Sequence, residues 1–342
     1  MNRSKNYKAV SFLYTALYAR GVAISYLFLQ CFLFSNLSLA ASDPVAITPP
    51  DGFVPENLIL ASEHGTTSKY IFIADKKNRT LTVWEGSEKK PHLFGAFAMD
   101  IGKLDGDKSS AGDHRTPEGI YFFREKMQGP SLDFNLYGKK AFATDYPNLF
   151  DIMAGKTGSG IWLHAVPDTT SLLRGSKGCV VVRNETIDKL SDLIAINHSP
   201  LLILDHVNYV PYETLIKKRA EISTWLEEWR DSWQNKNIDK YISFYSNKFS
   251  ALKMNKNVWK KYKAGLNEKY KFIKVTVKDP LIVIRNDQLI INYIQEYESD
   301  GLKDSGEKTL YVSRPSGQPA EILTEIWKPM ANELLAHKKS ED

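Results

Sequence analysis

Two residues near the middle of the chain, Cys179 and His164, have the types and the spacing that nucleophilic catalysis needs. A thiol becomes a nucleophile when a neighbouring base takes its proton, and imidazole does this near neutral pH. His164 ends the apolar stretch Ile161-Trp-Leu-His, 15 positions before the cysteine, so that a strand and a loop can return it to the sulfur. The pattern favours a catalytic cysteine over a buried structural one.

The segment that leads to the cysteine is Gly175-Ser-Lys-Gly178. Its two glycines allow a tight turn, which would expose the sulfur and aim the N–H groups of Gly178 and Cys179 at one oxygen. Each such donor typically contributes about 3–4 kcal/mol to the transition state of acyl transfer. The sequence therefore predicts an oxyanion site made by Gly178 and Cys179.

Other catalytic patterns are weaker. Ser87-Glu-Lys-Lys90 and Lys156-Thr-Gly158 match two motifs of the serine enzymes that bind penicillin, but no Ser-Asp-Asn lies between them. The seven histidines include no His-Glu-x-x-His pair, so we expect no metal and no cofactor.

The first 40 residues differ from the rest of the chain. Four basic side chains and no acidic ones accompany an apolar run from Val22 to Phe34, followed by the small residues of Ser38-Leu-Ala40-Ala41. This order predicts a secretory signal, with an uncleaved membrane anchor as the alternative. Both place the remaining chain in the periplasm or cell envelope. Removing the segment takes Cys31 with it and lowers the net charge from +5 to about +1, which argues against a nucleic-acid partner.

After a Pro-rich stretch, the chain alternates short β-branched and aromatic runs with turns, which predicts a β-rich domain with few helices. Strands are predicted at 70–74, 79–84, 93–99, 119–123 and 160–164, and a helix capped by Asn184 at 184–196.

A second pattern begins near Lys217. Helical spacing over Ile222–Trp233 and 238–245 is followed by strand patterns at 270–278, 281–285, 289–297, 309–314 and 321–327. Helices followed by an antiparallel sheet predict an α+β domain. Ten lysines lie between residues 248 and 278. They predict a solvated helical face, with a patch for anionic wall polymer as the alternative.

These patterns divide the chain into five parts. They are a signal or anchor (1–40), a linker (41–57), a catalytic domain (58–206), a linker (207–217) and the α+β domain (218–335).

The residues around Cys179 resemble the signature of the YkuD-type L,D-transpeptidase catalytic domain, a histidine followed after a spacer by Ser-x-Gly-Cys. Ile101-Gly-Lys and Gly112-Asp-His-Arg-Thr-Pro-Glu-Gly-Ile-Tyr121 are similar to further segments of that family, so the likeness spans about 68–206. Two positions depart from the pattern: Lys177 stands where a histidine is common, and Val181 where an arginine is common.

The resemblance implies that Cys179 attacks a tetrapeptide stem of peptidoglycan, expels D-alanine and passes the acyl group to an amine. It also implies substrate-binding roles for residues near the cleft, which we assign to Ser176, Lys177, Arg183 and His114. Because residues 179, 181 and 183 share one face of a regular strand, we expect Arg183 to replace the missing arginine.

The α+β domain resembles the nuclear-transport-factor-two-like domain, which implies a cone-shaped, cystatin-like fold. The pairing of the two domains resembles cell-shape L,D-carboxypeptidases. Hydrolysis of the thioester, which trims tetrapeptide to tripeptide, is therefore the alternative to transpeptidation. The cone would serve as a scaffold or a homodimer contact. A rival of another class is a wall-binding protein without catalysis, although retention of both Cys179 and His164 argues against it.

Overall fold

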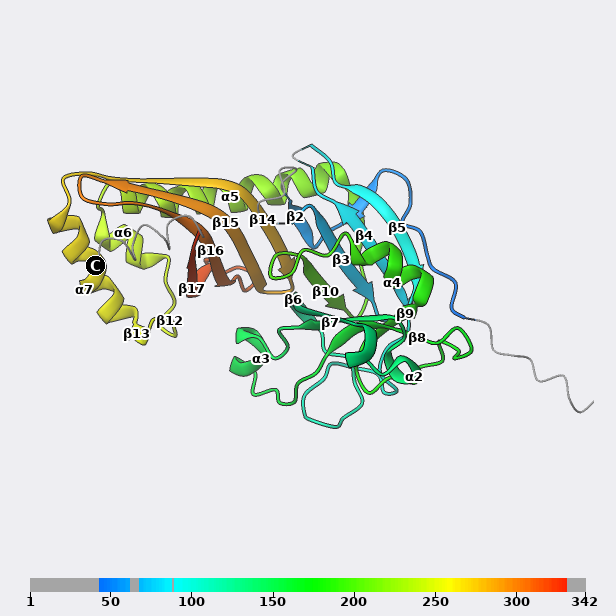
Figure 1. The fold of residues 1–342 in the computed structure, drawn as a ribbon. Helices are drawn as coiled ribbons and strands as arrows, with labels where there is room; N and C mark the ends of the chain where they lie inside the picture. The colour runs from blue at the N-terminus through cyan, green and yellow to red at the C-terminus, as the bar shows by residue number, and fades with distance from the viewer. Residues whose placement is uncertain (1–42, 62–67, 88, 331–342) are drawn as a thin grey trace, which may run out of the picture. The chain divides into compact units, whose positions relative to one another are not determined.

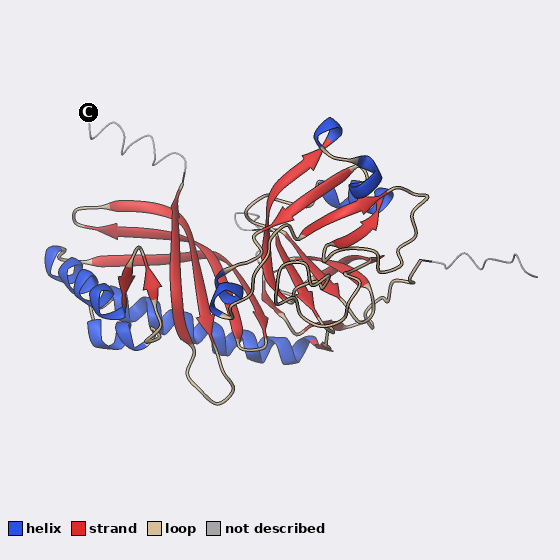
Figure 2. Ribbon diagram, turned by 90° about the horizontal axis from the view of Figure 1, so that it is seen from below, coloured by secondary structure: helices blue, strands red, loops and turns tan. Residues whose placement is uncertain are grey.

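The computed structural model describes residues 43–61, 68–87 and 89–330. In this part of the chain an eight-stranded sheet forms the N-terminal domain and a five-stranded sheet forms most of the C-terminal domain (Figure 1). The long helix α5 (Tyr212–Gln234) runs along the five-stranded sheet in both ribbon views (Figure 2). The fold therefore has the two predicted parts, one β-rich and one α+β.

The eight-stranded sheet has the order β5-β4-β3-β10-β6-β7-β8-β9. Its strands are β3 (Tyr70–Asp75), β4 (Thr80–Glu85), β5 (His92–Ala98), β6 (Gly119–Gln128), β7 (Lys140–Thr144), β8 (Trp162–Val166), β9 (Val180–Arg183) and β10 (Pro200–Leu204). β10 pairs with β3, and β8 with β9, in parallel, while the other neighbours are antiparallel. The five strands predicted from alternating runs are all confirmed, with ends shifted by a few residues.

The two edges of this sheet approach each other. Asp100, just beyond β5, forms an antiparallel bridge with Val181 of β9, and each residue's N–H donates to the other's carbonyl. Twist makes such closure possible, because each strand rotates relative to its neighbour. The bridge brings Asp100 beside the turn that carries Cys179, although 79 positions separate them in sequence.

Short helices fill the connections of the N-terminal domain. They are α2 (Phe134–Tyr137), α3 (Leu149–Met153) and α4 (Asn184–Ser191), with a single 3-10 turn at Gly129–Ser131. The helix predicted at 184–196 is confirmed as the shorter α4. Its predicted cap is wrong: the side-chain oxygen of Asn184 accepts the backbone N–H of Lys139 at 2.9 Å, so the residue joins α4 to the start of β7.

The C-terminal domain follows the predicted order of helices before sheet. After α5 come α6 (Ile238–Ser243), α7 (Lys256–Lys269) and a small hairpin of β12 (Ser250–Ala251) and β13 (Met254–Asn255). The large sheet has the order β17-β16-β15-β14-β2, formed by β14 (Ile273–Arg285), β15 (Gln288–Ser299), β16 (Lys303–Ser313), β17 (Glu321–Pro329) and β2 (Leu58–Leu60). Helix α7 occupies the middle of the lysine-rich run.

The two segments predicted as linkers carry regular structure instead. β1 (Phe53–Pro55) pairs with β11 (Tyr209–Pro211), and α5 begins at the next residue. β2, predicted to open the catalytic domain, pairs with β14 of the other sheet. The physical reason is burial, because Val54 and Ile59 are both 0% exposed and need apolar surroundings.

One hydrophobic core is shared across the domain boundary. Ile71, Ile120 and Leu202 of the eight-stranded sheet belong to the same buried cluster as Trp229 and Ile291 of the cone. The aromatic rings of Phe150 (α3) and Tyr311 (β16) pack with centroids 5.3 Å apart. A second cluster lies wholly within the N-terminal domain. The two domains therefore share part of their hydrophobic stabilisation.

Candidate active site

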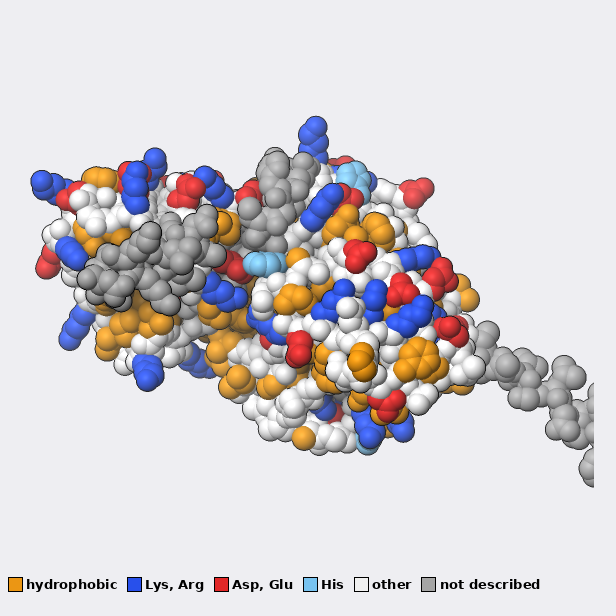
Figure 3. All heavy atoms as spheres, in the orientation of Figure 1, with side chains coloured by type: hydrophobic (Ala, Val, Ile, Leu, Met, Phe, Trp, Pro, Cys, Tyr) orange, Lys and Arg blue, Asp and Glu red, His pale blue; other side chains and the backbone are white. Residues whose placement is uncertain are grey.

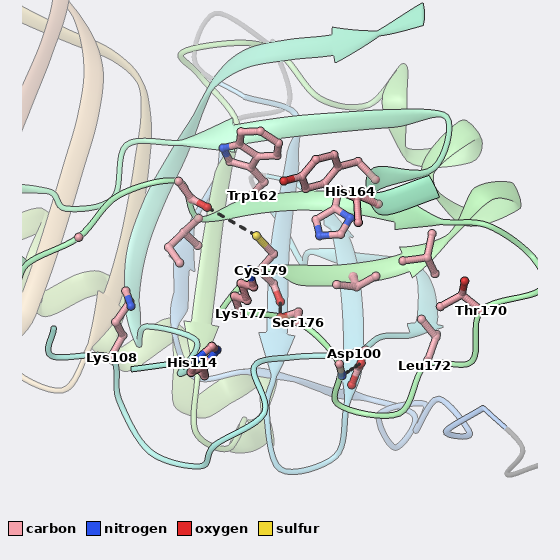
Figure 4. A pocket seen from close by; sticks show the side chains of 18 of the residues that line it. Asp100, Lys108, His114, Trp162, His164, Thr170, Leu172, Ser176, Lys177 and Cys179 are labelled. Carbon is pink, nitrogen blue, oxygen red and sulfur yellow. Dashed lines mark hydrogen bonds between the residues drawn. The ribbon is translucent and has the colours of Figure 1, made fainter. Parts of the chain in front are cut away.

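Cys179 lies in the turn immediately before β9, at the mouth of a cavity of about 670 Å³. Gly178 has φ of 133°, and a Cβ built there would lie 2.6 Å from the carbonyl oxygen of Arg115, so only glycine fits. The thiol donates toward the carbonyl oxygen of Gly160 at 3.6 Å, which is the dashed contact in Figure 4. The turn thus presents the sulfur to the cleft, as the glycine spacing predicts.

His164 lies on β8, the parallel neighbour of β9, where it pairs with Val181. Its Nδ1 is 2.6 Å from the carbonyl oxygen of Ala165, an acceptor, so Nδ1 carries the proton and Nε2 is the basic nitrogen. The ring lies edge-on against Tyr137, with centroids 5.1 Å apart, and is 5% exposed. Figure 4 shows this ring and the thiol on the same side of the cleft. The structure brings together the two residues predicted as nucleophile and base.

Burial sets the resting protonation of both groups. It raises the pKa of the Cys179 thiol to about 11, against the opposing effects of the Trp162 backbone and the Lys108 charge. It also lowers the pKa of His164 from 6.5, although the hydrogen bond to Ala165 acts in the other direction. At neutral pH the pair is therefore a neutral thiol beside a neutral imidazole. Such a pair reacts by transferring the thiol proton during attack, not from a preformed ion pair.

Ser176 shapes the turn. Its hydroxyl donates to the carbonyl of Cys179 at 2.8 Å and accepts the N–H of Gly178 at 3.1 Å. The N–H of Gly178, one of the two predicted oxyanion donors, is therefore already hydrogen-bonded to Ser176. The N–H of Cys179 remains as the candidate donor to an oxyanion. Ser176 lines the cavity, yet its hydrogen bonds hold the backbone that carries Cys179.

The two walls of the cavity differ in character. Trp162 and Tyr137, whose rings lie 4.9 Å apart, form an aromatic side. Lys108, His114 and Lys177 approach from the other side (Figure 4). Lys108 is 3% exposed and is held by the carboxylate of Asp113 at 2.7 Å, whereas Lys177 is exposed. Lys177 is thus the cleft lysine better placed to meet an anionic group of a ligand.

His114 lines the cavity in a left-handed conformation, with φ of 55°. Its Nδ1 is buried and has no hydrogen-bond partner within the described ranges. The preceding residue, Asp113, accepts N–H groups from Ser109, Ser110 and Arg115 in addition to the ammonium of Lys108. Burial works to raise the pKa of Asp113, but these donors outweigh it and hold that pKa far below its usual range. The carboxylate therefore fixes the loop that presents His114 to the cleft.

Arg183 does not reach the cleft, contrary to the expectation from strand alternation. Its guanidinium forms a bidentate ion pair with Asp43 and donates to the carbonyl of Thr170. These contacts aim the side chain at the N-terminal segment, and Arg183 is not among the residues that line the cavity. Period two correctly places Val181 in the cleft, but β9 ends at Arg183 and the side chain turns to the acidic partner.

Several residues of this site were not found from the sequence. Asp100, Lys108, Tyr137 and Trp162 all line the cavity. Trp162 stands two positions before His164 and Asp100 directly before Ile101-Gly-Lys, so proximity to the motifs was the available signal. Lys156, part of the Lys-Thr-Gly match to the serine enzymes, instead pairs with Asp107 at 2.7 Å and Asp151 at 3.0 Å.

The described part of the chain contains no group of three or more His, Cys, Asp or Glu side chains that could hold a metal ion. None of its helices combines the length and apolar character needed to cross a membrane.

Comparison with known proteins identifies both domains. Residues 68–203 match the family model of the YkuD L,D-transpeptidase catalytic domain, and residues 221–326 match the Cds6 C-terminal NTF2-like domain. No curated protein matches the chain.

Two solved structures are similar over most of their length. Bd1075 of Bdellovibrio bacteriovorus is 45% identical, with a TM-score of 0.76, and the match covers 82% of this chain and 99% of that one. The helical cell shape determining protein Pgp2 of Campylobacter jejuni is 26% identical, with a TM-score of 0.61, over 79% of this chain and 95% of that one. The chain belongs to the YkuD L,D-transpeptidase family, in the form that carries a C-terminal NTF2-like domain. It is a peptidoglycan-modifying enzyme of the cysteine peptidase or transpeptidase type.

Proposed function

We propose that this enzyme removes the terminal D-alanine from tetrapeptide stems of peptidoglycan through a thioester on Cys179. The observation that carries the proposal is the pairing of a half-buried thiol with a buried imidazole whose free nitrogen is basic, both facing one cavity. A nucleophile beside a general base is the arrangement that covalent acyl transfer uses.

Acylation begins when His164 takes the thiol proton as sulfur attacks the carbonyl carbon of the third, diamino-acid residue. A C–S bond forms and the carbonyl oxygen becomes an oxyanion, toward which the N–H of Cys179 can donate. The C–N bond then breaks, and His164 returns the proton to the leaving amine of D-alanine. The exposed ammonium of Lys177 is our candidate partner for the terminal carboxylate of the substrate.

The acceptor decides the second half of the reaction. When water attacks the thioester, the product is a tripeptide, and the enzyme is an L,D-carboxypeptidase. We favour this outcome because the same domain pairing extends over nearly the whole length of Pgp2, a protein that determines helical cell shape. Attack by the amine of a second stem, which gives a 3–3 crosslink, is the second candidate, because the matched catalytic family is that of the L,D-transpeptidases.

We also propose that the protein is exported, acts on the cell wall from the periplasm and takes part in setting cell shape. The basic and apolar N-terminal segment supports export. This N-terminal segment lies outside the described residues.

The test is incubation of the purified protein with disaccharide-tetrapeptide, with products read by mass. Tripeptide and free D-alanine are expected from the wild type, and neither from Cys179→Ala. Crosslinked dimers without tripeptide would establish transfer instead. Acylation of Cys179 by a carbapenem, seen as added protein mass, provides a second readout, and absence of both reactions would favour the non-catalytic wall-binding protein.

A further inference from the structure

Residues 167–175, here called the wall segment, connect β8 to the turn that carries Cys179 and form one side of the cavity. Thr170, Leu172 and Gly175 line it, and Figure 4 shows Thr170 and Leu172 on the side away from Lys108. Leu172 is 1% exposed and packs on Val166 and Val181, in a cluster that Cys179 also contacts. The segment contains neither helix nor strand, so contacts with other parts of the chain must set its position.

Charged side chains from distant parts of the chain hold the backbone of this segment. The N–H of Leu172 donates to Asp43 Oδ1 at 3.2 Å, and the carbonyl of Leu172 accepts from Arg79. The carbonyl of Thr170 accepts from Arg183. Hydrogen bonds to charged groups are about twice as strong as neutral ones. These contacts therefore fix the wall at Thr170 and Leu172, both of which line the cavity.

The charged groups that hold the wall are themselves paired. Arg183 Nε donates to Asp43 Oδ2 at 2.6 Å, and Arg79 pairs with Asp100 at 2.9 Å. Asp100 also accepts the N–H groups of Arg174 and Gly175, at 2.7 and 2.9 Å. The hydrogen bond from Arg183 lowers the pKa of Asp43, against the effect of burial, so Asp43 stays a carboxylate. Farther along, the N–H of Ile47 donates to Thr80 Oγ1 at 3.0 Å and holds the N-terminal segment on β4.

We propose that residues 43–47 form a strap, and that Asp43 acts through Arg183 as a positioning residue that sets the wall of the substrate cleft. Only the identity of the substrate in this proposal rests on the proposed function. The segment predicted as a linker is thus part of the catalytic unit. Arg183, predicted to bind the substrate, instead acts indirectly, by holding the wall segment.

The experiment compares Asp43→Asn, Arg183→Met, the double variant and a matched control, Asp51→Asn, in the full-length protein. Asp51 is an exposed carboxylate of the same N-terminal segment and is not among the cavity residues. KM for disaccharide-tetrapeptide is expected to rise about tenfold in Asp43→Asn, with kcat changed less than about threefold, because the wall orients substrate without touching the reacting atoms. The rate at which iodoacetamide alkylates Cys179 should stay at the wild-type value.

Two further readouts separate positioning from a general loss of structure. Limited trypsin digestion should cut after Arg174, within the wall, several times faster in Asp43→Asn than in the wild type or Asp51→Asn. The double variant should raise KM by less than the product of the two single effects, since both changes remove the shared ion pair between Asp43 and Arg183.

Unchanged KM together with unchanged trypsin cleavage would overturn the proposal, as would equal damage in Asp51→Asn or loss of alkylation in Asp43→Asn. If the wild type releases no D-alanine, the proposed function fails. The trypsin comparison then still decides whether the strap holds the wall.

Discussion

In the N-terminal domain, Cys179 and His164 are desolvated on one side and face an open cavity on the other. In the cone, Lys308 and Glu325 are desolvated on all sides and face each other at 2.6 Å, with side chains 9% and 3% exposed. Both regions bury titratable groups, but only those of the N-terminal domain face a cavity that a substrate can enter.

In the cone, hydrogen bonds join Lys308, Glu325, Tyr245 and Trp229. The second carboxylate oxygen of Glu325 accepts from the hydroxyl of Tyr245, which in turn accepts the indole N–H of Trp229 at 3.0 Å. Burial works to raise the pKa of Glu325, but the charges of Lys308 and Lys263 outweigh it, and the pKa is lowered. Saturated groups of this kind specify a core, whereas the thiol and imidazole of the cleft keep lone pairs and protons for a substrate.

The comparison predicts the largest loss of activity at the nucleophile. Cys179→Ser is expected to lower release of D-alanine by about 1,000-fold or more, because a hydroxyl is far less ionised than a thiol. The variant should unfold at the same urea concentration as the wild type. Near-normal turnover would remove Cys179 from the mechanism.

The base should come next. His164→Ala is expected to lower kcat/KM by about 100- to 10,000-fold, the usual range for a general base. In the wild type, burial lowers the pKa of His164, so the acid limb of kcat/KM should have its midpoint below pH 6.5.

Alkylation of Cys179 by iodoacetamide should rise with pH up to the thiol pKa of about 11. An alkylation plateau near pH 7 would show a preformed ion pair and contradict a resting state of neutral thiol and neutral imidazole.

In the cone the expected effect is on stability. Glu325→Leu leaves Lys308 buried without its carboxylate and is expected to lower the free energy of unfolding by about 3–5 kcal/mol. The double variant Glu325→Leu/Lys308→Met should recover much of this, because Lys308 is then no longer left buried without a partner. Urea unfolding gives the measurement.

An exposed pair in the same sheet provides the control. Lys278 and Glu296 lie at the surface, and Lys278→Met should change stability by no more than about 1 kcal/mol. If Glu325→Leu is equally mild, the cone's ion pair contributes little to stability. Activity per folded molecule should stay near the wild-type value in all these variants.

The smallest effect concerns Lys177. Lys177→Ala is expected to raise KM for tetrapeptide by about tenfold, because an exposed ammonium contributes modestly to binding a carboxylate. A tetrapeptide with an amidated terminus should be bound equally by wild type and variant. Equal losses on the two substrates would assign Lys177 to the turn and not to the carboxylate.

Much of the fold follows from local patterns. The alternating runs that became β3 to β6 and the helical spacing of α5 each specify an element without reference to the rest of the chain. Segments such as Leu58–Leu60 could not be assigned, because three apolar residues fit either sheet and only packing decides between them. The shared core shows the same limit, since sequence does not reveal that one face of the catalytic sheet packs on the cone.

For the site, the sequence alone predicted the candidate nucleophile, the candidate base and the glycine turn, because residue type and short spacing indicate those functions. The tertiary structure decided the direction of every long polar side chain. Arg183 could turn to the cleft or to Asp43 with the same backbone, and the ion pair with Asp43 settled its direction. The bridge between Asp100 and Val181 joined the edges of the sheet and brought a carboxylate to the wall of the cleft. Such contacts join residues far apart in sequence, so their energy depends on how the sheet closes and leaves no local pattern.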